Sequence, residues 1–162
     1  MPRLLFPGPF EPSLQFRYSI FTDKLKNAFF SARSAQQPSF DNSPIEYQHG
    51  NGSFFVKGKT KWNPINIKCY QFDGISILEF WTYFLQHQIL PDQAIDNYGS
   101  FYKHDLRVSV LGPEEFPTAT WVLHGAFYEN VDFGQMDRSS NEVIEIDATI
   151  RYDYATYKPF IG

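Results

Sequence analysis

The residues best suited to chemistry are scattered along this sequence. Histidines bind metals and transfer protons, and the four in this chain are His49, His87, His104 and His124. They have no metal-ligand spacing, and neither an HExxH nor a CxxC motif occurs. Isolated histidines usually take part in packing or lie on the surface. We therefore predict no metal site and no cofactor.

The chain also contains carboxylates and glycines of the kinds found in active sites, but not in the sequence patterns that catalysis requires. Glu114 and Glu115 are adjacent, whereas acid–base catalysis requires two carboxylates that converge on one pocket. The Gly50-Asn51-Gly52 turn lacks the lysine and the strand-to-helix context of a phosphate-binding loop, and no GxSxG motif is present. We predict a protein that is not an enzyme and has no catalytic residue, with both carboxylates in solvent.

Aromatic residues offer another kind of chemistry, because their rings stack on sugars and on nucleic-acid bases. A platform of this kind would make the chain a carbohydrate-binding β-sandwich. Core packing and subunit contacts are the alternative, which we favour. The aromatic residues concerned are Tyr47, Tyr98, Phe101, Tyr102, Tyr128 and Phe133.

A long two-faced strand is predicted from Asn141 to Tyr154. Successive side chains of a strand point to opposite faces, so the alternation predicts one buried face and one polar face. The strand is about twice the usual length of five to six residues, which favours strand addition between copies. The apolar face holds Ile144, Ile146, Ala148, Ile150, Tyr152 and Tyr154. Candidates for an inter-subunit or channel-lining face are Glu145, Asp147, Thr149, Arg151 and Asp153.

One helix is predicted over residues 76–88. Ser76 and Glu79 form a Ser-x-x-Glu capping box, and Pro91 follows the expected end. Apolar residues recur at helical spacing and predict packing against a sheet. These helix-packing residues are Ile77, Phe80, Trp81, Phe84 and Leu85.

Alternating segments predict the remaining strands of the sheet. Cys69, the single cysteine, lies in one of them, so we expect a buried structural thiol. The first two segments are expected to form a hairpin with each other. The segments are residues 14–21, 25–35, 54–60, 65–72, 106–111 and 120–127.

Two segments lack clean periodicity. Residues 1–13 contain four prolines and predict an extended arm ahead of a domain that spans residues 14–162. Residues 36–53 are rich in turn formers and predict a long loop or protruding hairpin. Connections of that length are uncommon unless they have a task of their own.

Composition limits the class of protein. A chain of 162 residues fits one domain, and its 19% aromatic content favours β-structure over a helical bundle. The net charge of −4 argues against stable nucleic-acid binding, which needs a basic surface. We find neither a signal peptide nor a run of about 18 apolar residues, so we expect a soluble protein made in the cytosol, without stable membrane binding.

Taken in order, these features resemble the major tail tube proteins of contractile-tailed bacteriophages, whose relatives include the Hcp-type tube of type VI secretion. The resemblance covers residues 14–157. It rests on the N-terminal hairpin, the long loop, a strand pair that begins at Lys59-Thr60-Lys61-Trp62, the capped helix, two strands around Gly125, and the terminal strand. It implies a mainly β fold, a β-sandwich or half-barrel of antiparallel strands with one flanking helix. Each copy would contribute to a continuous inner barrel in a hexameric ring.

The same resemblance implies a structural virion protein, assembled in the host cytoplasm. Its rings would stack into a tube that houses the tape measure protein and conducts DNA as transient cargo. Further partners would be the tail sheath, baseplate and tail terminator proteins. A mildly negative lumen would let DNA slide. The arm has no place in the family pattern, so a baseplate tube-initiator ring stays an alternative. The loop at residues 36–53 would reach the neighbouring ring, with Ile45, Glu46, Tyr47, Gln48, His49 and Asn51 as contact residues.

Overall fold

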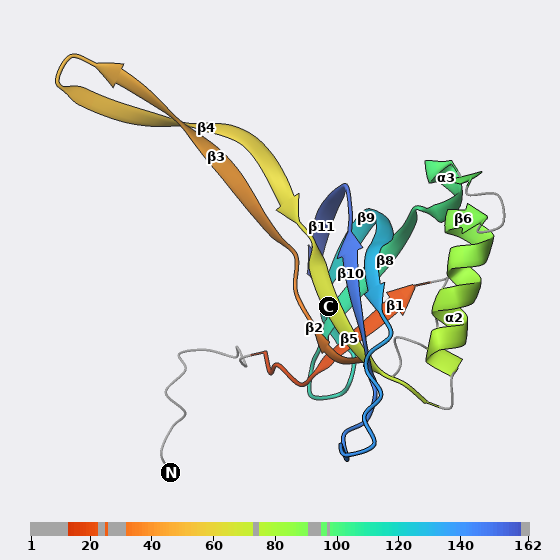
Figure 1. The fold of residues 1–162 in the computed structure, drawn as a ribbon. Helices are drawn as coiled ribbons and strands as arrows, with labels where there is room; N and C mark the ends of the chain where they lie inside the picture. The colour runs from red at the N-terminus through yellow and green to blue at the C-terminus, as the bar shows by residue number, and fades with distance from the viewer. Residues whose placement is uncertain are drawn as a thin grey trace, which may run out of the picture.

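A computed structural model describes residues 13–22, 25, 32–72, 75–90, 95–96 and 98–159. It is mainly antiparallel β-sheet with one long helix beside it, which confirms the predicted fold class (Figure 1). The strands are β1 (Tyr18–Thr22), β2 (Ala32–Ala35), β3 (Ser39–His49), β4 (Gly52–Asn63), β5 (Ile65–Tyr70), β6 (Ile89–Leu90), β7 (Ile95–Asp96), β8 (His104–Leu111), β9 (Pro117–Asp132), β10 (Glu145–Arg151) and β11 (Tyr154–Pro159). The helices are α2 (Ile75–Tyr83), the π-helical η1 (Phe84–Gln88) and α3 (Gly99–Tyr102).

The main sheet folds back on itself to make two layers. Its strand order is β1-β8-β9-β10-β5-β2, and β11 also pairs with β9. The first half of β9 pairs with β8 and β11, and its second half pairs with β10. One layer is therefore β1–β8–β9–β11, and the other is β9–β10–β5–β2.

A glycine permits the bend between these layers. Gly125 has φ +66°, and a Cβ placed there would lie 2.2 Å from the Asp153 carboxylate. Beside it, the Asp153 N–H donates to the His124 carbonyl at 2.9 Å. A residue with a side chain would be strained in this conformation and would also clash, so the corner requires glycine.

Alternating apolar side chains from both layers form the core. Ile65, Ile67 and Cys69 of β5 pair with Ile150, Ala148 and Ile146 of β10, and all six are at most 2% exposed. Burial raises the pKa of the Cys69 thiol to about 12. The prediction of a buried cysteine is confirmed.

The predicted helix is present as α2 and η1, and begins one residue earlier, at Ile75. Phe80 is buried and contacts the edge of the Tyr128 ring at a centroid distance of 5.5 Å. Trp81 is 48% exposed, whereas Tyr83, which was not predicted to pack, is 3% exposed. The side chain of Ser76 lies outside the described residues. None of the helices in the described part of the chain is long and apolar enough to cross a membrane.

The predicted N-terminal hairpin is wrong. β1 pairs with β8, and β2 pairs with β5. Alternation indicates which side chains share a face, but it does not indicate which strand is the neighbour. The Tyr18 hydroxyl does reach across to donate to the Ala32 carbonyl at 3.0 Å. The predicted arm lies outside the described residues, apart from Ser13.

The predicted limits of the terminal strand are also wrong. β10 begins at Glu145, the chain bends at Tyr152 and Asp153, and β11 continues to Pro159. The bend shifts the alternation by one residue, so Ala155 packs against the core while Tyr154 is 51% exposed. Tyr154 therefore does not share the buried face of Tyr152, as the sequence predicted.

Residues 36–53 belong to a hairpin that continues the edge of the sheet. β2 leads into β3 and β4 leads into β5, so one antiparallel ladder extends from Ala32 to Tyr70. The β3–β4 part leaves the body and projects from one end of it (Figure 1). All eleven residues of β3 are exposed.

Candidate assembly surfaces

The outer face of the β9–β10–β5–β2 layer is polar. Glu145, Asp147, Thr149 and Arg151 of β10 are partly exposed and alternate with buried residues, as predicted. Asp153 is not on this face, because it lies at the bend, where it forms an ion pair with Lys103 at 2.9 Å. The structure therefore brings four of the five candidate residues together on one surface.

Much of the charge on this face is paired. The Arg151 guanidinium donates two hydrogen bonds to the Glu129 carboxylate, at 3.0 and 3.1 Å. Arg33 of β2 pairs with Glu145, and this hydrogen bond raises the pKa of the arginine.

The remaining carboxylates of the face have polar neighbours. Asn66 donates to Asp147, which lies opposite Lys68 on one side and Asp132 on the other. With three cations and four carboxylates, the face is close to neutral.

Among the described residues, both edges of this layer are open. No described strand pairs with the outer edge of β2, or with β9 beyond Ala126 on the side where β8 ends. Unpaired strand edges present main-chain donors and acceptors that can pair with another chain. Each side of the layer therefore has one strand edge that could pair with another chain.

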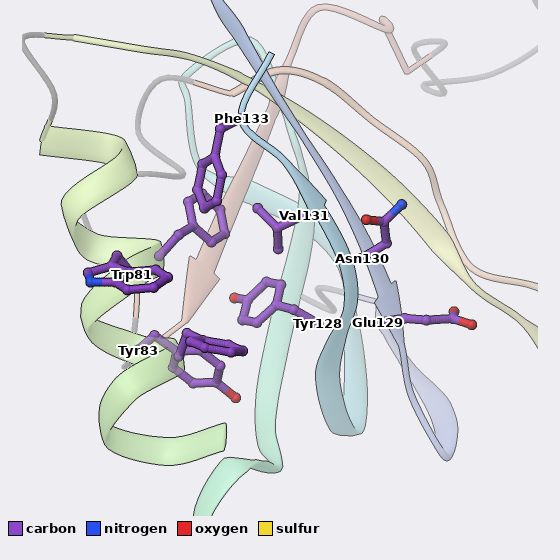
Figure 2. Close-up of a pocket in the computed structure, with 9 residues that line it drawn as sticks. Trp81, Tyr83, Tyr128, Glu129, Asn130, Val131 and Phe133 are labelled. Carbon is purple, nitrogen blue, oxygen red and sulfur yellow. The ribbon is translucent and has the colours of Figure 1, made fainter. Parts of the chain in front are cut away.

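An apolar hollow of about 250 Å³ lies between α2 and the second half of β9. Figure 2 shows aromatic rings of the helix facing Tyr128, Val131 and Phe133, while Glu129 and Asn130 point elsewhere. The Tyr83 and Tyr128 rings meet edge-on at 5.0 Å, and burial raises the pKa of Tyr128. The hollow is suited to apolar contact beside the open edge. In the described part of the chain, no three His, Cys, Asp or Glu side chains are grouped to hold a metal.

The protruding hairpin has one apolar face near its tip. Ile45 pairs with Val56 and Tyr47 pairs with Phe54, so these four share a face. Their exposed fractions are 44–54%, and the Tyr47 and Phe54 rings are stacked at 5.5 Å. The two β3 residues were predicted as contact residues from the sequence. The two on β4 were not, although the apolar run Phe54-Phe55-Val56 was the available signal.

The other contact residues predicted in the hairpin lie elsewhere on it. Glu46 and Gln48 share the opposite face, where they pair with Phe55 and Ser53. His49 pairs with Gly52 next to the turn that contains Asn51.

Aromatic residues anchor the base of the hairpin to the body. The Phe40 and Trp62 rings lie 5.2 Å apart, and Trp62 also contacts Tyr152 of the core at 5.9 Å. Tyr152 is 5% exposed. The hairpin is therefore tied to the body at its base, while its distal half contacts solvent.

The six aromatic residues proposed as a stacking platform are not together. Tyr128 is buried, Phe133 lines the hollow, and Tyr47 is on the hairpin. Tyr98 and Phe101 alone form an exposed pair, with centroids 6.4 Å apart. The six residues therefore do not form one surface on which sugars could stack.

The histidines are also dispersed. His49 lies at the hairpin tip, His104 contacts Tyr83, and His124 lies 3.5 Å from Asp105. The side chain of His87 lies outside the described residues. Glu114 and Glu115 are exposed in the turn between β8 and β9.

No protein-family model matches the chain, and no curated protein matches it. Solved structures do match. A chain in the tube-terminating cap of the anti-feeding prophage is 20% identical with a TM-score of 0.73, and the match covers 99% of this chain and 100% of that one. A chain in the baseplate of the same particle is 14% identical with a TM-score of 0.70, covering 93% and 97%.

A third match comes from the extended sheath–tube complex of PVC, an extracellular contractile injection system. It is 20% identical with a TM-score of 0.67, covering 92% of this chain and 93% of that one. This chain has a contractile-system tube fold. The expected tube fold is thereby confirmed, and at these identities the likeness concerns the fold alone.

Proposed function

We propose that this protein is a structural, non-enzymatic tube subunit that closes into hexameric rings, which stack into the tube of a contractile tail. One observation carries the proposal. The β9–β10–β5–β2 layer has one face buried in the core, an ion-paired polar face, and two open edges. A layer of this kind can continue from one copy to the next without a change in its core.

Ring closure would use main-chain pairing between the two edges. The outer edge of β2 in one subunit would meet the open edge of β9 in the next. Because the two edges differ, the contact is head-to-tail and closes into a ring when the rotation permits. Closure would also remove the exposed edges, which otherwise favour aggregation.

The polar face of the closed layer would line the bore. Glu145, Asp147, Thr149 and Arg151 are its central residues. Two of its cations are already paired with carboxylates, so the wall has little free positive charge to bind phosphates by counterion release. An elongated cargo would therefore pass without adhering, first the tape measure protein and then DNA.

The remaining partners follow from the resemblance to tail tubes. The sheath protein would surround the tube, and baseplate and terminator proteins would cover its ends. The finished tube would belong to the virion, after assembly in the host cytoplasm.

A specialised ring at one end of the tube is the second candidate. The match to a chain of a baseplate structure, at a TM-score of 0.70, favours it. An end ring would form hexamers that do not lengthen alone, whereas the repeating subunit would form tubes.

Negative-stain electron microscopy across a concentration series tests the proposal. We expect hollow rings at low concentration and tubes at high concentration. A monomer at every concentration, combined with saturable binding in a glycan screen, would contradict the proposal and favour a carbohydrate-binding module.

A further inference from the structure

The protruding hairpin and two of the loops lie at opposite ends of the subunit. Figure 1 shows the β3–β4 hairpin leaving one end of the body, while the β8–β9 turn and the β9–β10 loop extend from the other. A protein that stacks head-to-tail would bring these two ends together. Their chemistry can therefore be compared as that of two halves of a contact.

The hairpin end carries unpaired positive charge. Lys57, Lys59 and Lys61 are exposed on β4 and, together with Asp41 and Glu46 of β3, give the hairpin a net charge of +1. No ion pair found among the described residues involves the three lysines. The nearest carboxylate across the ladder, Asp41 opposite Lys61, instead accepts a hydrogen bond from Asn63 at 2.9 Å. The lysines thus remain available to a partner.

The loop end carries the opposite charge. Residues 112–116 and 133–144 contain four carboxylates and one arginine, for a net charge of −3. All four carboxylates are exposed, and the ion pairs described for the chain involve none of them. Asp137 accepts two hydrogen bonds from Ser139, which hold the pKa of its carboxyl low and keep it ionised. The carboxylates are Glu114, Glu115, Asp137 and Glu142.

Exposed apolar residues occur at both ends as well. The hairpin presents the face of Ile45, Tyr47, Phe54 and Val56 described above. The loops present Phe116, Met136 and Val143, which are 68%, 92% and 57% exposed. An isolated two-stranded hairpin is marginally stable in water, so a partner that covers this face would stabilise it.

We propose that the hairpin of one subunit docks on the acidic loop end of a second copy in the adjoining ring, with its lysines against the loop carboxylates. This inference rests on the proposed tube function and adds the receiving surface and its charge. It gives the stacking contact a direction, because basic meets acidic at only one orientation of the rings. Complementary charge of this kind specifies partners and their register.

Charge reversal tests the contact. The hairpin variant carries K57E, K59E and K61E, and the loop variant carries E114K, E115K and E142K. We expect each variant alone to form rings, but at least about tenfold fewer tubes than the wild type, because like charges then face each other. The matched control is R107E, which reverses one exposed arginine in the middle of β8, opposite Val122 and away from both surfaces, and should leave tube formation unchanged.

Mixing the two variants is the decisive experiment. The reversed hairpin then fits the reversed loops, and the native hairpin of one variant fits the native loops of the other. We expect the mixture to form tubes in which the two kinds of ring alternate. Normal tubes from the hairpin variant alone, or no tubes from the mixture of two ring-forming variants, would overturn the inference.

Salt provides an independent readout on the wild type. Raising salt from about 0.1 M to about 1 M shortens the Debye length from about 10 Å to about 3 Å. We expect tubes to shorten while rings persist, and tubes of unchanged length would overturn the inference. A wild type without rings under any condition would instead contradict the proposed function itself.

Discussion

The two halves of the ladder from Ala32 to Tyr70 share one backbone pattern and differ in their surroundings. In the β2–β5 half, Ile65, Ile67 and Cys69 are at most 2% exposed and pack into the core. In the β3–β4 half, Ile45 and Tyr47 are 46% and 49% exposed. The first half therefore obtains its stability within the subunit. The second half has apolar side chains without a core, which is typical of a surface that is covered in an assembly.

This difference separates folding from assembly. Changes in the β2–β5 half should act on the free energy of unfolding, and changes in the β3–β4 half should act on the association of subunits.

The largest effect on stability is expected for Ile67→Ala. Ile67 is fully buried, so the substitution should lower the free energy of unfolding by about 2–5 kcal/mol through lost burial and a cavity. Val56→Ala, in the exposed half of the same ladder, should cost less than about 0.5 kcal/mol. Urea denaturation of both variants measures the difference, and equal losses would contradict the distinction.

Gly125→Ala should have the next largest effect. The residue has φ +66°, and its new Cβ would press on Asp153, so a loss of at least about 1–2 kcal/mol is expected. The control is Gly52→Ala in the hairpin, where the nearest atom would lie 3.8 Å from the Cβ. Thermal unfolding of the two variants tests whether the bend requires glycine. A Gly125 variant as stable as the control would contradict that requirement.

Deletion of residues 45–53 should change stability little and assembly greatly. The deleted part contacts no core residue, so we expect the free energy of unfolding to change by less than about 1 kcal/mol. Rings should form, but they should not lengthen into tubes. Electron microscopy and urea denaturation of the same preparation measure both effects, and normal tubes would refute the role given to the hairpin.

The smallest effect on stability is expected from titration of the Cys69 thiol, which occurs only at alkaline pH. Burial raises its pKa from 9.0 to about 12 in the folded state, so the unfolded chain loses this proton first as pH rises. The contribution to stability is therefore intact below pH 9 and declines between pH 9 and about 12. Denaturation at pH 8 and pH 10 should show a smaller decline for Cys69→Ala than for the wild type, and equal declines would contradict the buried thiol.

Periodicity predicted the parts of the fold that depend on local patterns. The helix, with Phe80 in the core, follows from helical spacing, and the buried face of β10 follows from alternation. The pairing partners of the strands could not be predicted in this way. The alternating patterns of β1 and β2 indicate which side chains share a face, but not which strand lies beside them. The bend at Gly125 and Asp153 was missed as well, since it depends on contact between two strands that are distant in sequence.

The candidate surfaces were predictable to a similar degree. Alternation brought Glu145, Asp147, Thr149 and Arg151 to one face, but it also assigned Asp153 to that face, across a bend that the pattern does not reveal. The pairing of Ile45 and Tyr47 with β4 depends on the register of the hairpin, which includes an irregularity between Asn42 and Pro44. A one-residue shift exchanges the faces of a strand, so the apolar face required the structure.

A cryo-electron microscopy reconstruction of the assembled protein would show directly how the subunits pair. We expect a ring in which β2 of each subunit pairs with β9 of the next, and in which Asp147, Thr149 and Arg151 face the bore. A ring whose bore is lined by α2, or in which the edges of β2 and β9 stay unpaired, would contradict this expectation.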